Sequence, residues 1–140
     1  IRTSRLFGLS AQGLPAQAGK KSFFETMLGL AKEKDVLLGV TDEISCFTYT
    51  PDLARATKEI IEKKLDFGLY HVVNSDPASW YEALLELLNQ AGIKKPVEQV
   101  LSSKFPRPAK RPKFSILINT KLPAMRSYQE ALREFLNQLT

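Results

Sequence analysis

The amino-acid sequence predicts an α/β fold with a largely parallel sheet. Short apolar segments typical of strands alternate along the chain with longer segments in which apolar residues recur every three or four positions, as in amphipathic helices. Two of the helical segments begin with Ser-x-x-Glu, a pattern that caps helix N-termini. This alternation favours parallel strands joined by helical crossovers, and such folds bind ligands at the carboxyl ends of their strands.

The first third of the chain contains strands and one helix. Residues 1–8 (IRTSRLFG) are typical of a strand that ends at a glycine, and the small and polar residues 9–21 predict a loop. Residues 22–33 carry apolar side chains on one helical face. Two short extended segments are predicted after this helix, at 36–40 and 45–49.

A second helix is predicted to begin at Thr50-Pro51-Asp52 and to run to about Lys64. Thr50 suits the N-cap, Pro51 the first helical position, and the helix dipole favours a carboxylate at Asp52. This role at the helix start accounts for an aspartate at position 52 without any contact to a ligand. We expect the helix to pack inward through Leu53, Ala56, Ile60 and Ile61.

The middle of the chain repeats the pattern. Residues 68–73 (GLYHVV) are apolar enough to predict a buried strand. Ser79 and Glu82 form the capping box of the next helix, which Gly92 closes, and its single tryptophan, Trp80, lies on the apolar face. We therefore expect Trp80 to pack in the core, and we expect a strand at 97–101.

The basic segment, residues 104–113, is the most informative feature of the chain. It holds five cations, no acidic residue, and three prolines that keep the backbone extended and non-helical across residues 102–122: Lys104, Arg107, Lys110, Arg111 and Lys113, with Pro106, Pro108 and Pro112. Guanidinium groups pair with phosphate oxygens, so the segment suits a phosphate-bearing ligand. The alternative is a solvated loop whose charges only aid solubility. A strand is predicted at 115–118 and a last helix at 127–139, with a capping box at Ser127.

Composition limits the function classes. The chain has 140 residues, 44% hydrophobic and 25% charged, which fits one modest domain or half of a larger one. No apolar run approaches the roughly 20 residues of a membrane span. The single Cys46 predicts a reducing, cytoplasmic setting. The net charge of +5 permits nucleic-acid binding, but no nucleic-acid motif is present, so we expect neither a nucleic acid nor a membrane as partner. Because the chain opens inside an apolar strand at Ile1, we expect it to be a piece of a longer protein.

The sequence lacks a complete active site. It has no glycine-rich nucleotide turn, no Tyr-x-x-x-Lys pair and no metal-ligating cluster, so we predict no catalytic residue and no metal ligand in this segment. The only histidine, His71, lies in an apolar strand and is expected to be packed and hydrogen-bonded. Cys46 has no activating neighbour. Asp42 and Glu43 are expected to be a solvated pair on a turn.

Six segments in order resemble dTDP-4-dehydrorhamnose reductase, a family of the extended short-chain dehydrogenases/reductases: IRTSRLFG, FFETMLGLAKE, TYTPDLARA, GLYHVVNSDPASWYEAL, FPRPAKRPKFSILINTKL and MRSYQEALREFL. The resemblance implies that residues 1–140 are the C-terminal portion of such an enzyme. They would comprise the end of a Rossmann-like parallel sheet and a small α/β substrate-binding lobe. The Gly-rich turn and the catalytic Tyr-x-x-x-Lys would lie upstream.

The resemblance also implies site residues. Arg2, Thr3 and Ser4 follow the strand that reaches the nicotinamide end of the cofactor. Arg5 stands where the family usually has a tryptophan that packs against the sugar, so we expect substrate contact here with altered sugar recognition. Arg111 sits in the family's Arg-Pro-x-Asn-Ser pattern and is expected to bind the nucleotide diphosphate.

Arg107 and Lys110 are weaker candidates for the same contact. The stretch from Asp42 to Thr48 resembles the family's Asp-Gln-x-Gly-x-Pro-Thr turn. The departures from the family patterns are Arg5, Glu43, Ser45, Cys46, Phe47 and Phe114.

The function implied is NAD(P)H-dependent reduction of the 4-keto group of a dTDP-4-keto-6-deoxysugar, in dTDP-L-rhamnose biosynthesis. NADPH or NADH would be bound mainly by the upstream part, and this segment alone would be inactive. Two alternatives stay open, a non-catalytic binding or regulatory subunit and a reductase or epimerase of another nucleotide sugar. The resemblance also leaves open a homodimer and a Mg²⁺ ion that assists it.

Overall fold

The computed structural model describes residues 1–9 and 21–139, so most of the loop predicted at 9–21 lies outside the described residues. The four helices of this part are α1 (Phe23–Glu33), α2 (Thr50–Glu62), α3 (Trp80–Gln90) and α4 (Tyr128–Asn137). Its strands are short: β1 (Leu6–Phe7), β2 (Leu37–Val40), β3 (Ile44–Ser45), β4 (Thr48–Tyr49), β5 (Ala78–Ser79), β6 (Val97–Val100) and β7 (Phe114–Ser115). One 3₁₀ turn, η1, covers Ser102–Lys104.

The strands pair mostly in parallel, as the sequence predicted. β1 pairs with β4, β2 with β6 and β3 with β7 in parallel, whereas β3 and β5 are antiparallel. In the described residues these pairs form three small sheets and not one continuous sheet. The α/β class is therefore confirmed.

Three of the helices begin with a capping box. The boxes predicted at Ser79 and Ser127 are present, and a third, not predicted, joins Ser22 to Glu25. In each, the serine hydroxyl accepts a hydrogen bond from a backbone N–H three residues on, and the glutamate accepts one from the serine N–H. These local contacts set where α1, α3 and α4 start.

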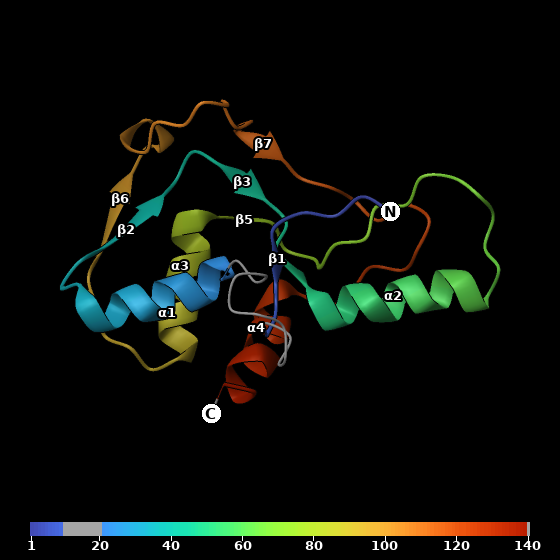
Figure 1. Ribbon diagram of the computed structural model, residues 1–140, viewed down its shortest axis with the longest axis horizontal. Helices are drawn as coiled ribbons and strands as arrows, with labels where there is room; N and C mark the ends of the chain where they lie inside the picture. Colours follow the sequence, from blue (N-terminus) through green and yellow to red (C-terminus); the bar gives the residue numbers. More distant parts are fainter. Residues whose placement is uncertain (10–20, 140) are drawn as a thin grey trace.

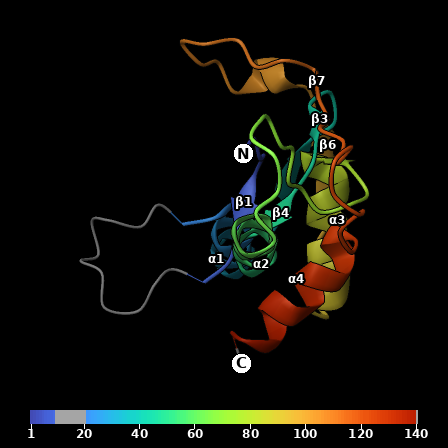
Figure 2. The ribbon, with the colours of Figure 1, turned by 90° about the vertical axis from the view of Figure 1, so that its right-hand side faces the viewer.

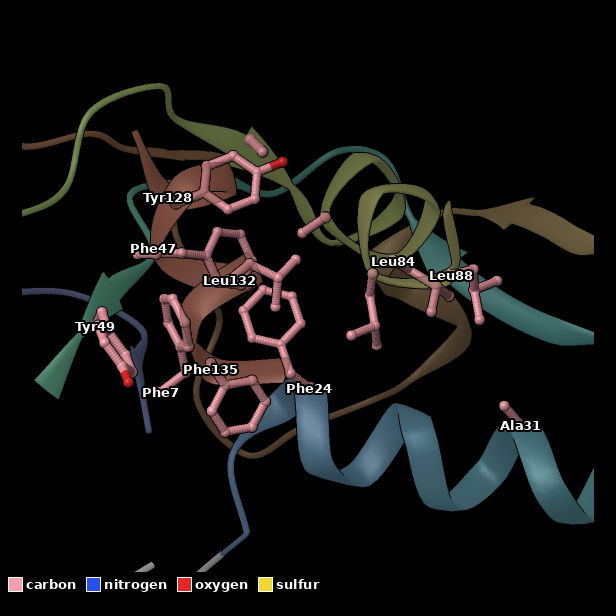
Figure 3. Packing of buried hydrophobic residues seen from close by; sticks show 14 of the residues in the cluster. Phe7, Phe24, Ala31, Phe47, Tyr49, Leu84, Leu88, Tyr128, Leu132 and Phe135 are labelled. Atoms are coloured by element: carbon pink, nitrogen blue, oxygen red, sulfur yellow. The ribbon is translucent and has the colours of Figure 1, made fainter. Parts of the chain in front are cut away.

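The core lies between α1, α3, α4 and the short strands (Figure 3). Phe7 of β1 packs edge-on against Phe24 and Phe135, with ring centroids 4.9 and 5.9 Å away. Leu84 and Leu132, which are both fully buried, join α3 to α4. The apolar faces predicted for these helices are thus the faces that form the core.

The predicted inward face of α2 is only partly confirmed, because Leu53, Ala56 and Ile60 are half-buried but Ile61 is exposed. The helix begins at Thr50 with Tyr49 as its N-cap residue, one residue earlier than expected, and no side chain caps it. Asp52 is its buried residue, whereas Ile61 is 69% exposed. In Figure 1, α2 extends away from the other helices.

Several predicted strands are shorter than expected or absent. The segment 68–73 buries Val72 and Val73 but is not a strand, and its ladder contact is a single parallel bridge between Arg2 and His71. The strand predicted at 115–118 is reduced to β7, with Ile118 exposed. The strand predicted at 1–8 is reduced to β1, and the segment 45–49 divides between β3 and β4. A strand needs a neighbour along its whole length, and these segments have only short neighbours in the described part.

The two remaining strand predictions, at 36–40 and 97–101, are confirmed as β2 and β6. Their register runs from Leu37 opposite Val97 to Val40 opposite Val100. The prediction that residues 102–122 are entirely non-helical is wrong at their start, because η1 makes a single 3₁₀ turn before the first proline. This turn lies at the end of β6 and opens the basic segment.

Candidate functional site

A cleft of about 340 Å³ lies beside the start of α3. Its apolar wall comes from α1 and β2, and its polar wall comes from residue 43, η1 and the basic segment. The lining residues are Lys21, Phe23, Thr26, Met27, Leu38, Val40, Glu43, Trp80, Ser102, Phe105, Arg107 and Arg111. Both strand β2 and its neighbour β6 end at this cleft, which is the ligand-binding edge expected of parallel strands.

Glu43 is the centre of the polar wall. Its side chain is mostly buried, and its Oε2 accepts a hydrogen bond of 2.9 Å from the indole Nε1 of Trp80. The same oxygen lies 3.6 Å from Nη1 of Arg111. The expectation that Glu43 is solvated is therefore wrong, because the fold places an indole N–H and a guanidinium against its carboxylate.

Asp42 is also engaged. Its carboxylate accepts hydrogen bonds from the backbone N–H of Ser102, at 2.7 Å, and from the Ser102 hydroxyl, at 2.9 Å. The bond from the Ser102 backbone lowers the pKa of Asp42 below its usual value. Asp42 thereby ties η1, and with it the start of the basic segment, to the end of β2. The predicted solvated pair is thus wrong for this residue as well.

Arg5 packs within the wall beside the cleft. Its guanidinium carbon lies 3.8 Å from the centre of the Trp80 ring, a cation–π distance. Its Nη1 donates to the carbonyl of Ala78 at 3.1 Å, and its Nη2 donates to the carbonyl of Glu43 at 3.0 Å. Burial lowers the pKa of Arg5 to about 10. The backbone of Arg5 is in the left-handed region (φ 40°), where the chain turns before β1.

A smaller hollow of about 230 Å³ adjoins the cleft. Lys21, Phe23 and Trp80 line both cavities. Arg5 lines only the smaller one and Arg111 only the cleft, in the part of the chain that the structure describes. The indole of Trp80 therefore borders two cavities, each with its own arginine in the lining. The expectation that Trp80 packs in the core is only partly right, because its ring packs on the core and also borders both cavities.

The basic segment projects from the body of the molecule (Figure 2) and is exposed throughout. Of the candidates predicted there, Arg107 and Arg111 line the cleft, whereas Lys110 is not among its lining residues. Lys104 pairs instead with Glu98, at 3.7 Å. The structure thus brings two of the three predicted phosphate contacts to one cavity, and the phosphate role itself stays a prediction.

Arg2, Thr3 and Ser4 form the segment that precedes β1. The backbone of Arg2 pairs with the chain on either side of His71, through 2.7 and 2.9 Å hydrogen bonds. The Thr3 hydroxyl is buried and has no hydrogen-bond partner among the described residues. Ser45 Oγ donates to the carbonyl of Ser115 at 3.0 Å, so the 2.6 Å contact with Ser4 has Ser4 as donor.

This segment fits a nicotinamide cofactor in its chemistry. The Ser4 hydroxyl donates to Ser45, and its oxygen can still accept a hydrogen bond. The buried Thr3 hydroxyl has no partner among the described residues, and the amide group of a ligand could provide one. His71 matches its predicted packed state, with Nδ1 donating to the carbonyl of Ile118 at 3.2 Å. The assignment of Arg2, Thr3 and Ser4 to a cofactor stays a prediction.

Sequence reasoning missed a buried ionic network at Asp52. Its carboxylate, 5% exposed, accepts two 2.9 Å hydrogen bonds from the Arg126 guanidinium and one of 2.7 Å from Asn74 Nδ2. Arg55 is a further partner, and Arg126 also pairs with Glu134 at 2.7 Å. The helix-start role of Asp52 is therefore incomplete as an explanation. Nothing local in the sequence could have revealed a partner 74 residues away.

The described part of the chain has neither a metal-binding cluster nor a membrane-spanning helix. No group of three or more His, Cys, Asp or Glu side chains in residues 1–9 and 21–139 is arranged to hold a metal ion. Over the same residues, no helix has the length and apolar character needed to cross a membrane. Cys46 is buried and donates to the carbonyl of Leu117 at 3.4 Å.

The described residues form an α/β domain with a cleft lined on one side by cations, and comparison with known families identifies the domain. The model of the RmlD substrate binding domain matches residues 1–140, so the chain belongs to this family. The resemblance to dTDP-4-dehydrorhamnose reductases stated from the sequence is thereby confirmed.

Relatives agree with this assignment. The chain is 34% identical to the spore coat polysaccharide biosynthesis protein SpsK of Bacillus subtilis over 99% of its length and 46% of that protein. It is similar to a dTDP-4-dehydrorhamnose reductase of Clostridium acetobutylicum, with a TM-score of 0.85, 34% identity, and coverage of 99% of this chain and 47% of the other. A Bacillus anthracis dTDP-4-dehydrorhamnose reductase in complex with NADP has a TM-score of 0.84 and 30% identity, with the same coverage of both chains. The chain thus spans about half the length of the relatives it matches.

Proposed function

We propose that this chain is the nucleotide-sugar-binding part of an NAD(P)H-dependent reductase that acts on the 4-keto group of a dTDP-4-keto-6-deoxysugar. Two kinds of observation support the proposal. The family is that of the RmlD substrate binding domain, and relatives at 30–34% identity are dTDP-4-dehydrorhamnose reductases, one of them in complex with NADP. The cleft itself has the size and the mixed lining of a small-molecule site.

The observation that carries the proposal is the position of Arg107 and Arg111 on one side of a cleft whose other side is apolar. A nucleoside diphosphate sugar has the same division, because its diphosphate is anionic and its sugar and base have apolar faces. Arg111, 43% exposed, keeps most of its N–H donors free of the Glu43 carboxylate. In this proposal Arg111 binds the diphosphate, with Arg107 beside it and Lys110 as an outer contact.

The cofactor belongs to the same proposal. When bound, the nicotinamide supplies the hydride that reduces the C4 carbonyl. Arg2, Thr3 and Ser4 would contact its nicotinamide end, with the Thr3 and Ser4 hydroxyls as polar partners. Because the chain spans about half the length of its relatives, the proposal places the group that protonates the sugar oxygen, and most of the cofactor site, outside residues 1–140.

Three further parts of the proposal concern the setting of the protein. The single cysteine supports a cytoplasmic location. A homodimer is retained as a proposal, to be measured by light scattering with and without MgCl₂. The comparison with and without MgCl₂ tests whether the Mg²⁺ ion implied by the resemblance assists the dimer.

Titration calorimetry of the chain with dTDP tests the proposed binding. Replacing Arg111 by Met removes a charge-assisted contact worth about 1.5–3 kcal/mol, so we expect dTDP to bind about 10- to 100-fold more weakly. Lys104→Met is the matched control, because Lys104 is a cation of the same segment but pairs with Glu98 and does not line the cleft. Equal losses in the two variants would show that only the overall positive charge attracts dTDP.

The reductase activity is tested on the protein combined with its nucleotide-binding part, by following NAD(P)H oxidation after a dTDP-4-keto-6-deoxysugar is added. Turnover supports the proposal. Tight dTDP binding without turnover would favour the binding or regulatory subunit instead. One observation speaks for keeping that second candidate: Arg5 and Glu43, which depart from the family pattern, both belong to the wall of the cavities.

A further inference from the structure

Trp80 is one of two aromatic side chains in the described part of the chain that line both the cleft and the smaller hollow, the other being Phe23. It begins α3, and its ring is half-buried, with part of its surface open to the cavities. Phe23 shares this position on the α1 side, with its ring centroid 4.7 Å from that of Trp80. The protein has a single tryptophan, so any indole contact made in this cleft is a contact of Trp80.

Neighbouring groups hold the Trp80 ring in one orientation. Its Nε1 donates to Glu43 Oε2 at 2.9 Å, which fixes the edge of the ring. Arg5 lies over the ring at 3.8 Å, and Phe47 meets it edge-on with centroids 5.4 Å apart. Arg5 is itself held by two backbone carbonyls. The indole therefore cannot turn without breaking these contacts, which is the property of a preformed binding surface.

Arg5 and Arg111 approach the indole from different cavities. Arg5 lines the smaller hollow and is in close contact with the ring, whereas Arg111 lines the cleft with its guanidinium carbon 5.8 Å from the ring centre. Arg5 thus contacts the ring and lines the smaller hollow. Trp80 and Arg111 both line the cleft, so a ligand in the cleft can contact both side chains.

We propose that Trp80 is the surface on which the hexose of a nucleotide sugar packs, and that Arg5 and Glu43 are positioning residues that hold the indole for it. This inference rests on the proposed function. It assigns Arg5 a role through Trp80, in place of the direct substrate contact expected from the sequence.

The spacing of the groups supports the assignment. In a nucleotide sugar the hexose is bonded directly to the terminal phosphate, so the sugar surface and the phosphate-binding cation must be neighbours. Trp80 and Arg111 satisfy this condition, and both also contact Glu43. A pyranose ring presents an apolar C–H face, and aromatic rings provide a large apolar surface for such faces. Phe23 and Met27 extend the apolar surface beside Trp80.

The test uses the fluorescence of Trp80 together with calorimetry on the 140-residue chain. We expect dTDP-glucose to change the emission of Trp80 and to bind more tightly than dTDP. We expect the sugar to raise the affinity about threefold to tenfold, which is the size of one aromatic contact. This ratio of the affinities for dTDP-glucose and dTDP is the gain from the sugar. If both ligands bind in the calorimeter with equal affinity and equal effect on the emission, the inference is overturned and the proposed nucleotide binding survives. If neither ligand binds, the proposed function itself fails.

Variants separate positioning from general stability. Trp80→Leu should abolish the gain from the sugar, measured as the ratio of the affinities of this same variant for dTDP-glucose and for dTDP. Glu43→Gln keeps an acceptor for the indole N–H, and should therefore retain the gain. Arg5→Met should reduce the gain and shift the emission of Trp80. Circular dichroism checks that each variant is folded, and calorimetry with dTDP reports on the cleft independently of the sugar.

Two results would overturn the assignment of positioning roles. One is a folded Arg5→Met variant with an unchanged gain from the sugar and unchanged emission. The other is a folded Trp80→Leu variant that still binds dTDP-glucose more tightly than dTDP by the original factor. If Arg5→Met does not fold, Arg5→Lys provides the second measurement, because lysine keeps the cation over the ring but loses one of the two carbonyl contacts.

Discussion

Replacing Asp52 by Asn tests the buried ionic network that joins α2 to α4. Asp52 is 5% exposed, and its carboxylate receives both 2.9 Å hydrogen bonds of the Arg126 guanidinium. Asparagine has nearly the same shape but no charge, and its amide nitrogen would face the donors of Arg126 or Asn74. The substitution therefore removes the ion pair without creating a cavity.

The expected loss follows from the surroundings of the two partners. Removing one member of a buried ion pair costs about 3–5 kcal/mol. Arg126 is 31% exposed and keeps its 2.7 Å contact with Glu134, so we take the lower end, about 3 kcal/mol. For 140 residues the unfolding entropy is about 0.3 kcal/mol per degree, and the midpoint should fall by about 10 °C.

The pH dependence gives an independent check. Burial alone would raise the pKa of Asp52, but the hydrogen bonds from Arg126 and Asn74 outweigh it and leave the pKa below its usual value. A carboxyl group whose folded-state pKa is depressed stabilises the fold above its unfolded pKa of about 3.9. That stability is lost as the pH falls through the folded-state pKa. The difference in the free energy of unfolding between wild type and Asp52→Asn should therefore be constant near neutral pH and become smaller in acid.

Urea unfolding at pH 7 and at lower pH measures both effects. Arg55→Met is the matched control, because Arg55 also pairs with Asp52 but is 62% exposed, and its loss should cost less than about 1 kcal/mol. The reasoning would be refuted if Asp52→Asn lowered the free energy of unfolding by less than about 1 kcal/mol at pH 7. It would also be refuted if the decrease in this free energy were as large in acid as at pH 7.

Two further predictions concern packing. Gly39→Ala should destabilise by about 1–3 kcal/mol, because an added Cβ would lie 2.8 Å from the backbone Cα of Tyr81. Gly29→Ala in α1 is its counterpart and should stabilise by about 0.5–1 kcal/mol, since no heavy atom of the described residues lies within 4 Å of the new Cβ. Chemical unfolding of both variants measures these changes in the free energy of unfolding. Changes of the same sign in the two variants would contradict the packing argument. Burial raises the pKa of the Cys46 thiol, so a disulfide reagent should react with it slowly in the folded protein and quickly in denaturant. Fast reaction in both states would contradict its burial.

The helices were the most predictable part of the fold. Their starts depend on side chains three residues apart, as at Ser79 and Ser127, and such contacts are visible in the sequence. The box at Ser22 has the same pattern and could have been found by the same reasoning. The strands were less predictable, because the segment 68–73 is apolar enough for a strand but meets only one short neighbour.

The candidate site was predictable as a concentration of charge but not as a set of contacts. The prolines and cations marked the whole basic segment, and the family resemblance singled out Arg111, with Arg107 and Lys110 as weaker candidates. Of these three, Arg107 and Arg111 line the cleft. Their surroundings could not be anticipated. Glu43 was expected in solvent because its neighbours in sequence are those of a turn, whereas its partners Trp80 and Arg111 lie far along the chain.

The sequence by itself thus determined the α/β class, the starts of α3 and α4, the family and the concentration of cations in the basic segment, because each of these depends on residue type and local spacing. Only the tertiary structure decided which charges meet. Arg5 reaches Ala78 across 73 residues and Asp52 reaches Arg126 across 74, and such contacts exist only once the strands and helices between them have packed. The free energy of a buried charge depends on those distant partners, so the roles of Arg5, Glu43 and Asp52 could be assigned only in the folded chain.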